Sequence, residues 1–257
     1  MSAKDDQRLL SALGADHPEA SRVLNVPAGD GTFSRLLRER GHTVTSADLF
    51  PEGCTEDPSC VEADMNAPLP FEDGAFDVVV SQEGVEHLEN LAGFLRESRR
   101  ILRPGGTIWI TTPNFMDLSS RLAFLLSGQK SYKAGLPNEN STLWGRDGDR
   151  LYHGHAFTLP YFQLRYLLRV VGFEDVSVGA RGWSRSSCVL YPFFLPLNAL
   201  VLRYGMASRA RKDAKHGRTP PDDALMDELR TQGLSRALLC GKGITVRARV
   251  PDQPTNR

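Results

Sequence analysis

The sequence has few cysteines and no excess of charge of either sign. A chain of 257 residues does not need disulfides to be stable, and no paired Cys-x-x-Cys spacing is present, so we expect a reducing cytoplasm. The 31 basic and 31 acidic residues balance, so the chain lacks the positive net charge that is typical of a nucleic-acid-binding protein. A hydrophobic fraction of 40% still suffices for a packed core. The four cysteines are Cys54, Cys60, Cys188 and Cys240.

Long hydrophobic runs are also scarce. The apolar segment from Val189 to Tyr204 is shorter than the roughly 20 residues that a membrane-spanning helix needs, and Pro192 and Pro196 interrupt it. The first residues carry acids where a secretory signal would carry bases followed by an apolar run. We therefore predict a globular protein that does not cross a bilayer and has no cleaved leader.

Apolar strand patterns and amphipathic helix patterns alternate along the first half of the chain. This alternation predicts an α/β fold with a Rossmann-like, mostly parallel sheet and helices on both faces. Two later strand patterns predict an antiparallel hairpin at the C-terminal end. The predicted strands are 23–26, 42–47, 60–63, 76–80, 107–111, 173–178 and 243–250, and the predicted helices are 6–13, 32–40, 91–102, 118–126 and 158–171.

The first predicted strand runs directly into a glycine-rich turn. Gly29 and Gly31 can take positive φ angles and let a ligand approach the backbone, and Thr32 can cap the following helix. Asp48 ends the second strand, where a carboxylate can accept both ribose hydroxyls of an adenosine. A dinucleotide fold is the competing interpretation, but Ser34 stands where its third glycine is expected. Together these features predict a nucleoside site.

The segment from Val23 to Gly31, Val-Leu-Asn-Val-Pro-Ala-Gly-Asp-Gly, resembles the first motif of class I S-adenosylmethionine-dependent methyltransferases. The segments Phe76-Asp-Val-Val-Val and Leu102-Arg-Pro-Gly-Gly resemble the fourth and fifth strand motifs of that family, and the likeness covers roughly residues 20–180. The resemblance implies a seven-stranded sheet and S-adenosyl-L-methionine as cofactor. It places Ala28, Gly29 and Gly31 at the methionine moiety, Asp48 with Leu49 at the ribose, Asp64 and Met65 at the adenine, and Gln82 at the reacting end.

The sequence departs from the family pattern in two places. Asn25 stands where an acid is usual, and Pro27-Ala28 stands where Gly-Cys is common. Asn25 can still form hydrogen bonds, but it lacks the charge that often organises the turn. These departures leave open the alternative that the chain is a non-catalytic or regulatory protein that binds S-adenosylmethionine.

Acids and histidines follow the fourth strand. Glu83, Glu86 and His87 have i, i+3, i+4 spacing, which on a helical turn would place all three on one face. Together with His155 they could hold a divalent metal that lowers the pKa of a substrate hydroxyl. The group resembles the Glu-x-x-Glu-His site, with its distal His, of small-RNA 3′-end 2′-O-methyltransferases. The alternative is that the Glu-His pair orients the following helix and binds no metal.

A second histidine pair, His153 and His155, precedes the predicted helix at 158–171. One of the two is our candidate for the base that removes a proton from the acceptor, and Glu83 is the third candidate catalytic residue. We predict O-methylation of a small molecule or of a lipid- or sugar-linked acceptor. An RNA 2′-O-methyltransferase is an alternative, although no aromatic residues alternate with the basic ones as stacking platforms.

We interpret the chain as one methyltransferase domain over 1–257. Residues 20–114 form its cofactor-binding half, 115–155 a lid or substrate insertion, 156–180 and 240–250 the C-terminal sheet elements, and 181–239 an apolar and basic insertion. Within 189–218 an apolar segment adjoins basic residues, a combination suited to peripheral contact with the inner membrane surface. A hydrophobic lid or a homodimer contact is the alternative. The basic residues are Arg203, Arg209, Arg211, Lys212, Lys215 and Arg218.

Overall fold

A computed structural model describes residues 3–253 apart from 129–137, 139, 141, 148–149, 155–156 and 220. The chain divides into two compact units. The first contains residues 1–113, 136–177 and 245–257, and the second contains 114–135 and 178–244. The predicted insertion at 115–155 is therefore shared between the units, whereas the whole of the predicted insertion at 181–239 lies in the second.

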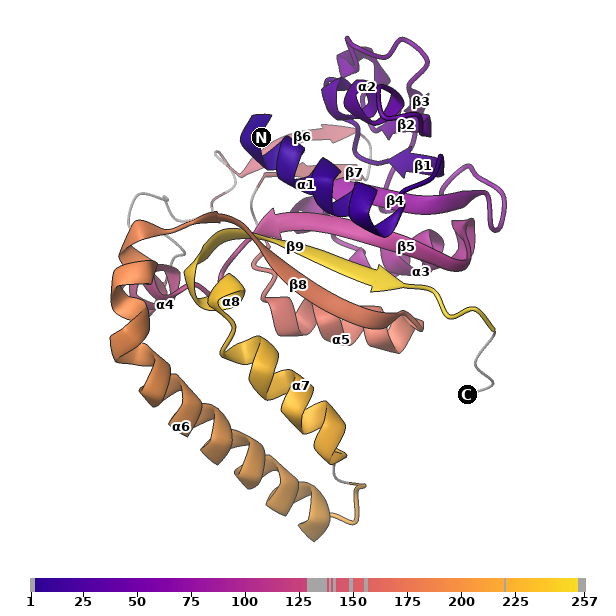
Figure 1. Ribbon diagram of the computed structural model, residues 1–257. Helices are drawn as coiled ribbons and strands as arrows, with labels where there is room; N and C mark the ends of the chain where they lie inside the picture. The colour runs from indigo at the N-terminus through magenta and orange to yellow at the C-terminus, as the bar shows by residue number, and fades with distance from the viewer. Residues whose placement is uncertain are drawn as a thin grey trace. The chain divides into compact units, whose positions relative to one another are not determined.

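Seven strands form one sheet in the order β3-β2-β1-β4-β5-β9-β8 (Figure 1). Strand β1 pairs in parallel with β2 and β4, so Val23 lies opposite both Val44 and Val78. Strand β9 runs opposite to β5 (Figure 1). The predicted Rossmann-like sheet with C-terminal antiparallel strands is confirmed. The strands are β1 (Arg22–Asn25), β2 (Thr43–Asp48), β3 (Val61–Glu62), β4 (Phe76–Gln82), β5 (Leu102–Pro113), β8 (Glu174–Trp183) and β9 (Gly241–Arg249).

Helices of the first unit cover the sheet. Helices α1 (Ala3–Asp16) and α2 (Thr32–Arg38) pack their apolar side chains against the centre of the sheet, where Val23, Val78 and Trp109 are buried. Helix α3 (Leu91–Ile101) contacts β5 and α5 (Tyr161–Val171), and Figure 1 draws α1 in front of the sheet and α3 behind it. The strand order reverses direction at β1, so ligands are expected at the carboxyl ends of β1 and β4.

The helix after the glycine turn begins differently from our prediction. Its N-cap is Gly31, with a φ of 85°, and no side chain caps it. The N–H of Thr32 instead donates to Asp30 Oδ1 at 2.9 Å. The predicted capping by Thr32 is therefore wrong, because the acid two residues earlier bonds to the backbone locally. The left-handed φ at position 31 is one that glycine adopts without steric cost.

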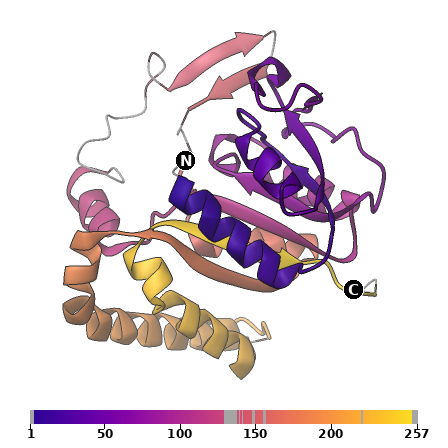
Figure 2. The same ribbon diagram turned by 45° about the horizontal axis from the view of Figure 1, so that its top comes forward.

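A smaller antiparallel hairpin is formed by β6 (Leu143–Asp147) and β7 (Arg150–His153). Figure 2 shows this hairpin in pink, separate from the larger sheet. In its register, Leu143 lies opposite His153. The first unit also contains two short 3-10 turns, Pro51–Gly53 and Val85–His87.

The second unit is mainly helical. Helix α6 (Arg185–Lys215) contacts α4 (Leu118–Ser127), α7 (Asp223–Gly233) and α8 (Arg236–Cys240). Pro192 and Pro196 lie inside α6, so they do not interrupt the helix as we expected. Each proline removes one backbone hydrogen bond, and apolar packing on either side of them offsets this loss. The packed side chains include Cys188, Leu190, Tyr191 and Leu195, against Leu118, Leu239 and Cys240.

Helix α6 changes our expectation about membranes. By length and composition it could cross a bilayer, and only 6% of its apolar window is buried. It is the one helix of this kind in the described part of the chain. Our prediction counted only the apolar segment from 189 to 204 and took the two prolines as interruptions, whereas the helix that contains this segment has 31 residues.

Candidate functional site

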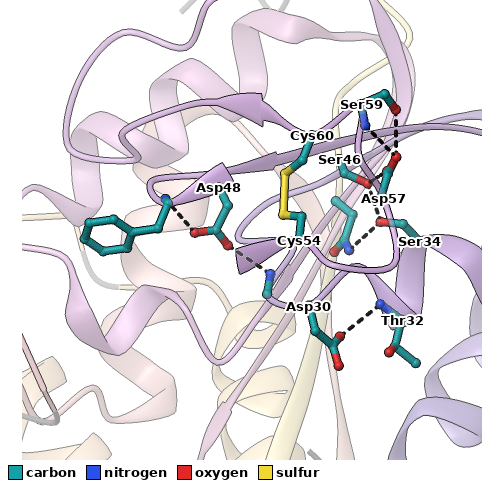
Figure 3. Close-up of a disulfide and its surroundings, with 12 residues drawn as sticks. Asp30, Thr32, Ser34, Ser46, Asp48, Cys54, Asp57, Ser59 and Cys60 are labelled. Atoms are coloured by element: carbon teal, nitrogen blue, oxygen red, sulfur yellow. Dashed lines mark hydrogen bonds between the residues drawn. A yellow bond between two sulfur atoms is a disulfide. The ribbon is translucent and has the colours of Figure 1, made fainter. Parts of the chain in front are cut away.

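The carboxylate of Asp48 joins the glycine turn to the loop that follows β2. Its Oδ2 accepts a hydrogen bond from the N–H of Gly29 at 2.9 Å, and its Oδ1 accepts one from the N–H of Phe50 at 3.0 Å. These two bonds hold the carboxylate at the carboxyl edge of the sheet, as Figure 3 shows. The predicted ribose-binding acid thus lies beside the predicted glycine turn.

Two cavities meet at this edge of the sheet. The first has a volume of about 710 Å³, and four predicted cofactor residues, Asp48, Leu49, Asp64 and Met65, line it. The second encloses about 1160 Å³ and is lined by Ala28, Gly29 and Gln82, among other residues. The predicted adenosine-side residues and the predicted methionine-side residues therefore separate into adjoining cavities. Pro27 and Glu83 line both cavities.

The boundary between the cavities depends on close packing at Gly84. A Cβ at this position would lie 2.4 Å from Cδ of Pro27, so the position has no room for a side chain. The preceding Glu83 has a φ of 50°, a left-handed backbone conformation that is strained in a residue other than glycine. Its N–H donates to the carbonyl oxygen of Thr111 at 2.9 Å, which holds this backbone against β5.

A buried polar network lies behind the glycine turn (Figure 3). Asn25 Nδ2 donates to Ser34 Oγ at 2.9 Å, and Ser34 Oγ lies 2.7 Å from Ser46 Oγ, which accepts the Ser34 proton. Ser46 Oγ also donates to Asp57, whose Oδ2 pairs with the guanidinium of Arg38 at 2.6 Å. Asn25 therefore connects through two serines to a buried carboxylate, so a charge is present near the turn despite the missing acid at position 25.

Asp57 is the charged member of this network. Burial raises the pKa of the Asp57 carboxyl, but hydrogen bonds from Ser46, Ser59 and Arg38 outweigh burial and hold the pKa well below its ordinary value. The side chain is therefore ionised at neutral pH. It also lies against the turn itself, because a Cβ on Gly31 would be 3.1 Å from both Cβ and N of Asp57.

Gly31 is consequently a packing position. Its φ of 85° and the neighbouring Asp57 both favour glycine, and neither cavity includes it among its lining residues. We predicted that it faces the methionine moiety. The structure places it on the side of the turn that contacts the loop carrying Asp57.

That loop contains a disulfide between Cys54 and Cys60, with Cα atoms 6.2 Å apart (Figure 3). We expected no disulfide, since the spacing of these cysteines follows no familiar motif. The pair closes the loop on either side of Asp57, and the N–H of Glu56 in the same loop donates to the carbonyl oxygen of Asp30 at 2.9 Å. The loop thus contacts the glycine turn through backbone as well as side chains.

The predicted metal group does not assemble in the described residues. Glu86 is 1% exposed, and its Oε2 accepts a hydrogen bond from Thr112 Oγ1 at 3.1 Å, whereas Glu83 and His87 line the first cavity. The expected i, i+3, i+4 face is wrong because the left-handed Glu83 precedes a 3-10 turn that begins only at Val85. Among the described residues, no three His, Cys, Asp or Glu side chains are arranged to hold a metal ion. His155, the predicted fourth ligand, lies outside the described residues.

His153 lies at the first cavity and has a carboxylate partner. Its Nε2 is 2.6 Å from Glu89 Oε1, and its carbonyl oxygen accepts a hydrogen bond from Nδ1 of His87 at 2.8 Å. This second bond leaves the proton of a neutral His87 on Nδ1, so Nε2 is its basic nitrogen. The structure therefore brings two imidazoles to the first cavity.

We did not predict several residues that line these cavities or, like Glu89, bond to a residue that does. Asp6 lines the second cavity, and burial raises the pKa of its carboxyl. Glu89 is only two residues beyond the predicted Glu-His group, but its role depends on the hairpin that brings His153 to it. Asn66 follows the predicted adenine-contacting pair and could have been found by extending that motif. Also missed were the aromatic residues Phe50 and Tyr152, whose rings meet edge to face with centroids 5.3 Å apart.

Comparison with known proteins gives a consistent result. Residues 24–110 match the model of a family described as a methyltransferase domain. A malonyl-[acyl-carrier protein] O-methyltransferase of Serratia marcescens is 34% identical over 166 residues, which cover 62% of this chain and 55% of that protein. A demethylmenaquinone methyltransferase of Beutenbergia cavernae is 34% identical over 125 residues, covering 46% of this chain and 51% of that protein. The chain thus spans about half the length of these curated relatives.

A solved structure shows the same fold over nearly the whole chain. It is a SAM-dependent methyltransferase from Archaeoglobus fulgidus, with a TM-score of 0.54 and 16% sequence identity. The match covers 95% of this chain and 94% of that one.

Proposed function

Because this chain belongs to the class I S-adenosylmethionine-dependent methyltransferases, we propose that it binds S-adenosyl-L-methionine beside the glycine turn and methylates a small molecule or a lipid- or sugar-linked acceptor, at an oxygen. The single observation that carries the cofactor assignment is the Asp48 carboxylate held by Gly29 and Phe50 at the carboxyl edge of β2. Relatives named for malonyl-acyl-carrier-protein and demethylmenaquinone support acceptors attached to a carrier or a lipid.

The residues at the two cavities fit this cofactor. Asp48 offers a carboxylate for ribose hydroxyls, and the apolar side chains of Leu49 and Met65 offer surfaces for an adenine ring in the first cavity. The backbone of Ala28 and Gly29 lines the second cavity, where the methionine moiety would lie. When bound, the cofactor supplies a sulfonium methyl group, which is already a strong electrophile. The protein then has to align the acceptor and remove its proton.

We assign proton removal to His153. Its hydrogen bond to Glu89 fixes the orientation of the imidazole ring at the cavity, in the way that a carboxylate orients a catalytic histidine. Glu83, at the boundary shared by both cavities, is positioned to orient an acceptor near the reacting end of the cofactor. His155 and a divalent metal remain alternatives for the same step, but the described residues do not form a metal site, so we assign no step to a metal.

Isothermal titration calorimetry tests the cofactor assignment. We expect S-adenosylhomocysteine to bind, and we expect Asp48→Ala to weaken its binding roughly 10- to 150-fold, because a hydrogen bond to a charged group contributes about 1.5–3 kcal/mol. Glu62→Ala is the matched control, since Glu62 is an exposed acid at the end of the adjacent β3 and lines neither cavity. Binding of NADH in preference to S-adenosylhomocysteine would reject the proposal.

A transfer assay tests the role of His153. Tritiated S-adenosylmethionine is incubated with the protein and a total lipid extract, and label in the organic phase is counted. We expect His153→Ala to lower turnover by about 100-fold, the lower end of the contribution of a general base, while the affinity for S-adenosylhomocysteine changes less than about twofold. Equal loss of affinity and turnover would instead assign His153 to cofactor binding.

The competing function is a regulatory protein that binds S-adenosylmethionine without catalysis. Asn25 and Pro27-Ala28 favour it, since these positions depart from the family pattern. The buried network that connects Asn25 to Asp57 argues against it, because the turn still has a nearby negative charge. Transfer of label to any acceptor in the assay above would dispose of the regulatory alternative.

A further inference from the structure

Helix α6 has apolar side chains on two opposite sides. One side packs within the second unit, where Cys188, Tyr191 and Leu195 adjoin the cluster of Leu118 and Leu239. These positions recur every three or four residues, as expected for one face of a helix. The helix is therefore already attached to its own unit along that face.

The opposite side is exposed, and we call it the α6 apolar face. Its members also recur at helical spacing, and their side chains remain 53% to 76% exposed. An isolated exposed apolar residue needs no explanation, but a continuous stripe of large ones indicates an interaction surface. The α6 apolar face consists of Val189, Phe193, Leu197, Leu200, Val201 and Tyr204.

The neighbouring helix α4 extends this surface. Helices α4 and α6 are in contact, and α4 ends in exposed Phe124, Leu125 and Leu126. Leu125 is 79% exposed, the largest value among the exposed large apolar side chains of the described residues. Two packed helices of one unit therefore both present apolar side chains outwards.

The charge of α6 changes abruptly along its length. No charged residue lies between Arg185 and Arg203, whereas the segment from Arg203 to Arg218 carries six basic residues. The only acid in that segment, Asp213, is buried and pairs with Arg209 Nε at 2.8 Å. The exposed charge that follows the apolar face is thus positive. We call residues 203–218 the basic segment.

An apolar face followed by exposed positive charge is complementary to one class of partner. Acyl chains accept the apolar side chains, and anionic headgroups attract the lysine and arginine side chains. A protein partner would have to supply both an apolar groove and an acidic patch. A bilayer containing anionic phospholipid supplies both without any specific fold.

The attachment of α6 decides its orientation relative to such a bilayer. A helix that crosses the hydrocarbon core must be surrounded by lipid or by other membrane-embedded protein. One side of α6 is instead tied to α4, where Arg121 donates to Asn198 Oδ1 at 2.7 Å and Ser187 Oγ donates to Asp117 Oδ1 at 2.6 Å. If this side were immersed in lipid, Arg121 and Asp117 would either lose their partners or be buried in hydrocarbon. Each such change costs several kcal/mol.

We propose that α6 lies along the surface of an anionic phospholipid bilayer, with the α6 apolar face among the upper acyl chains and the basic segment against the headgroups. This goes beyond the methyltransferase function, since it rests on the second unit alone and would hold for any activity of the first. It would also keep the protein beside acceptors that are dissolved in the membrane.

Vesicle co-sedimentation of the 257-residue chain tests the proposal. Phosphatidylcholine vesicles containing about one third phosphatidylglycerol are compared with pure phosphatidylcholine vesicles, because each basic residue near an anionic surface contributes about 1 kcal/mol. We expect binding to the anionic vesicles at low salt and at least a tenfold weaker partition to the neutral ones. Equal binding to both, or no binding to either, would overturn the assignment to anionic lipid.

Two variants separate the apolar and charged contributions. F193S/L197S/L200S should lower the partition coefficient at least tenfold at any salt concentration, and R209Q/R211Q/K212Q should lower it only at low salt. The matched control is Y166S/V170S on α5, whose side chains are 61% and 63% exposed but lie outside the α6 apolar face. Unchanged affinity for S-adenosylhomocysteine and unchanged circular dichroism show that the variants are folded, and keep this test separate from that of the methyltransferase function.

Three other outcomes would contradict the proposal. Resistance of the membrane-bound protein to extraction by alkaline carbonate would show that α6 crosses the bilayer. A dimer in analytical ultracentrifugation that F193S/L197S/L200S dissociates would assign the face to a second copy of the chain. Loss of vesicle binding in the α5 control variant would show that exposed apolar residues anywhere on the protein drive the association.

Discussion

The glycine turn and helix α6 arrange their polar and apolar groups in opposite ways. Behind the turn, the polar side chains of Asn25, Ser34, Ser46 and Asp57 are buried and bonded to one another, and the apolar side chains of β1 and β4 beside them are inaccessible. On α6, large apolar side chains face outwards and basic ones follow them. The first arrangement lies beside two cavities at the carboxyl edge of the sheet, whereas the second leaves a large apolar surface exposed.

The largest effect should come from the same substitution made in both regions. Leu24 on β1 is 0% exposed and Leu200 on α6 is 66% exposed. Leu24→Ala should lower the free energy of unfolding by about 2–5 kcal/mol, because it removes buried apolar contacts and leaves a cavity. Leu200→Ala should change it by less than about 0.5 kcal/mol. Urea denaturation followed by circular dichroism measures both. A large destabilisation by Leu200→Ala would mean that the α6 apolar face is buried in the folded protein.

The next effect concerns the buried charge behind the turn. Asp57→Asn should destabilise the protein at neutral pH by about 1–3 kcal/mol, since it weakens charge-assisted hydrogen bonds from Arg38 and Ser46. The pKa of Asp57 is lowered in the folded state, so its stabilising contribution is present above the unfolded pKa of about 4 and is lost as the pH falls towards the folded value.

The difference in unfolding free energy between wild type and Asp57→Asn should therefore be constant from pH 7 to about pH 5 and shrink below about pH 4. Urea denaturation at a series of pH values measures it. A difference that grows on acidification would contradict an ionised Asp57.

The smallest predicted effect is the difference in stability between alanine substitutions at two glycines with nearly the same φ. Gly31 and Gly41 have φ angles of 85° and 88°, but a Cβ on Gly31 would lie 3.1 Å from Asp57, whereas one on Gly41 would meet nothing within 4 Å. Gly41→Ala should cost about 1–2 kcal/mol, the penalty of a left-handed conformation. Gly31→Ala should lower the free energy of unfolding by more than this amount, because the added Cβ would also displace the loop carrying Asp57. Equal destabilisation in thermal denaturation would show that Asp57 does not pack against the turn.

The fold could largely be predicted because buried parallel strands and amphipathic helices leave a periodic apolar pattern. The same applies to Gly29 and Asp48, whose positions at strand ends follow from that pattern. Glu86 could not be placed correctly, because the left-handed backbone at Glu83 changes the direction of the side chains that follow. Asp57 carries no local signal. Its role depends on a loop that approaches the turn only in the folded protein.

Helix α6 shows the opposite kind of error. Pro192 and Pro196 are strong local signals against a helix, yet apolar packing on α4 and α8 offsets their cost and the helix continues through both. Local propensity was therefore a good guide where the chain forms a regular sheet and a poor one where tertiary contacts support an irregular helix.

The most direct test of the account is a crystal structure of the protein grown with S-adenosylhomocysteine. We expect the ribose hydroxyls on the carboxylate of Asp48, the adenine against Leu49 and Met65, and the amino-acid end beside Ala28 and Gly29. A ligand bound elsewhere, or a nucleotide pyrophosphate at the glycine turn in its place, would contradict the account.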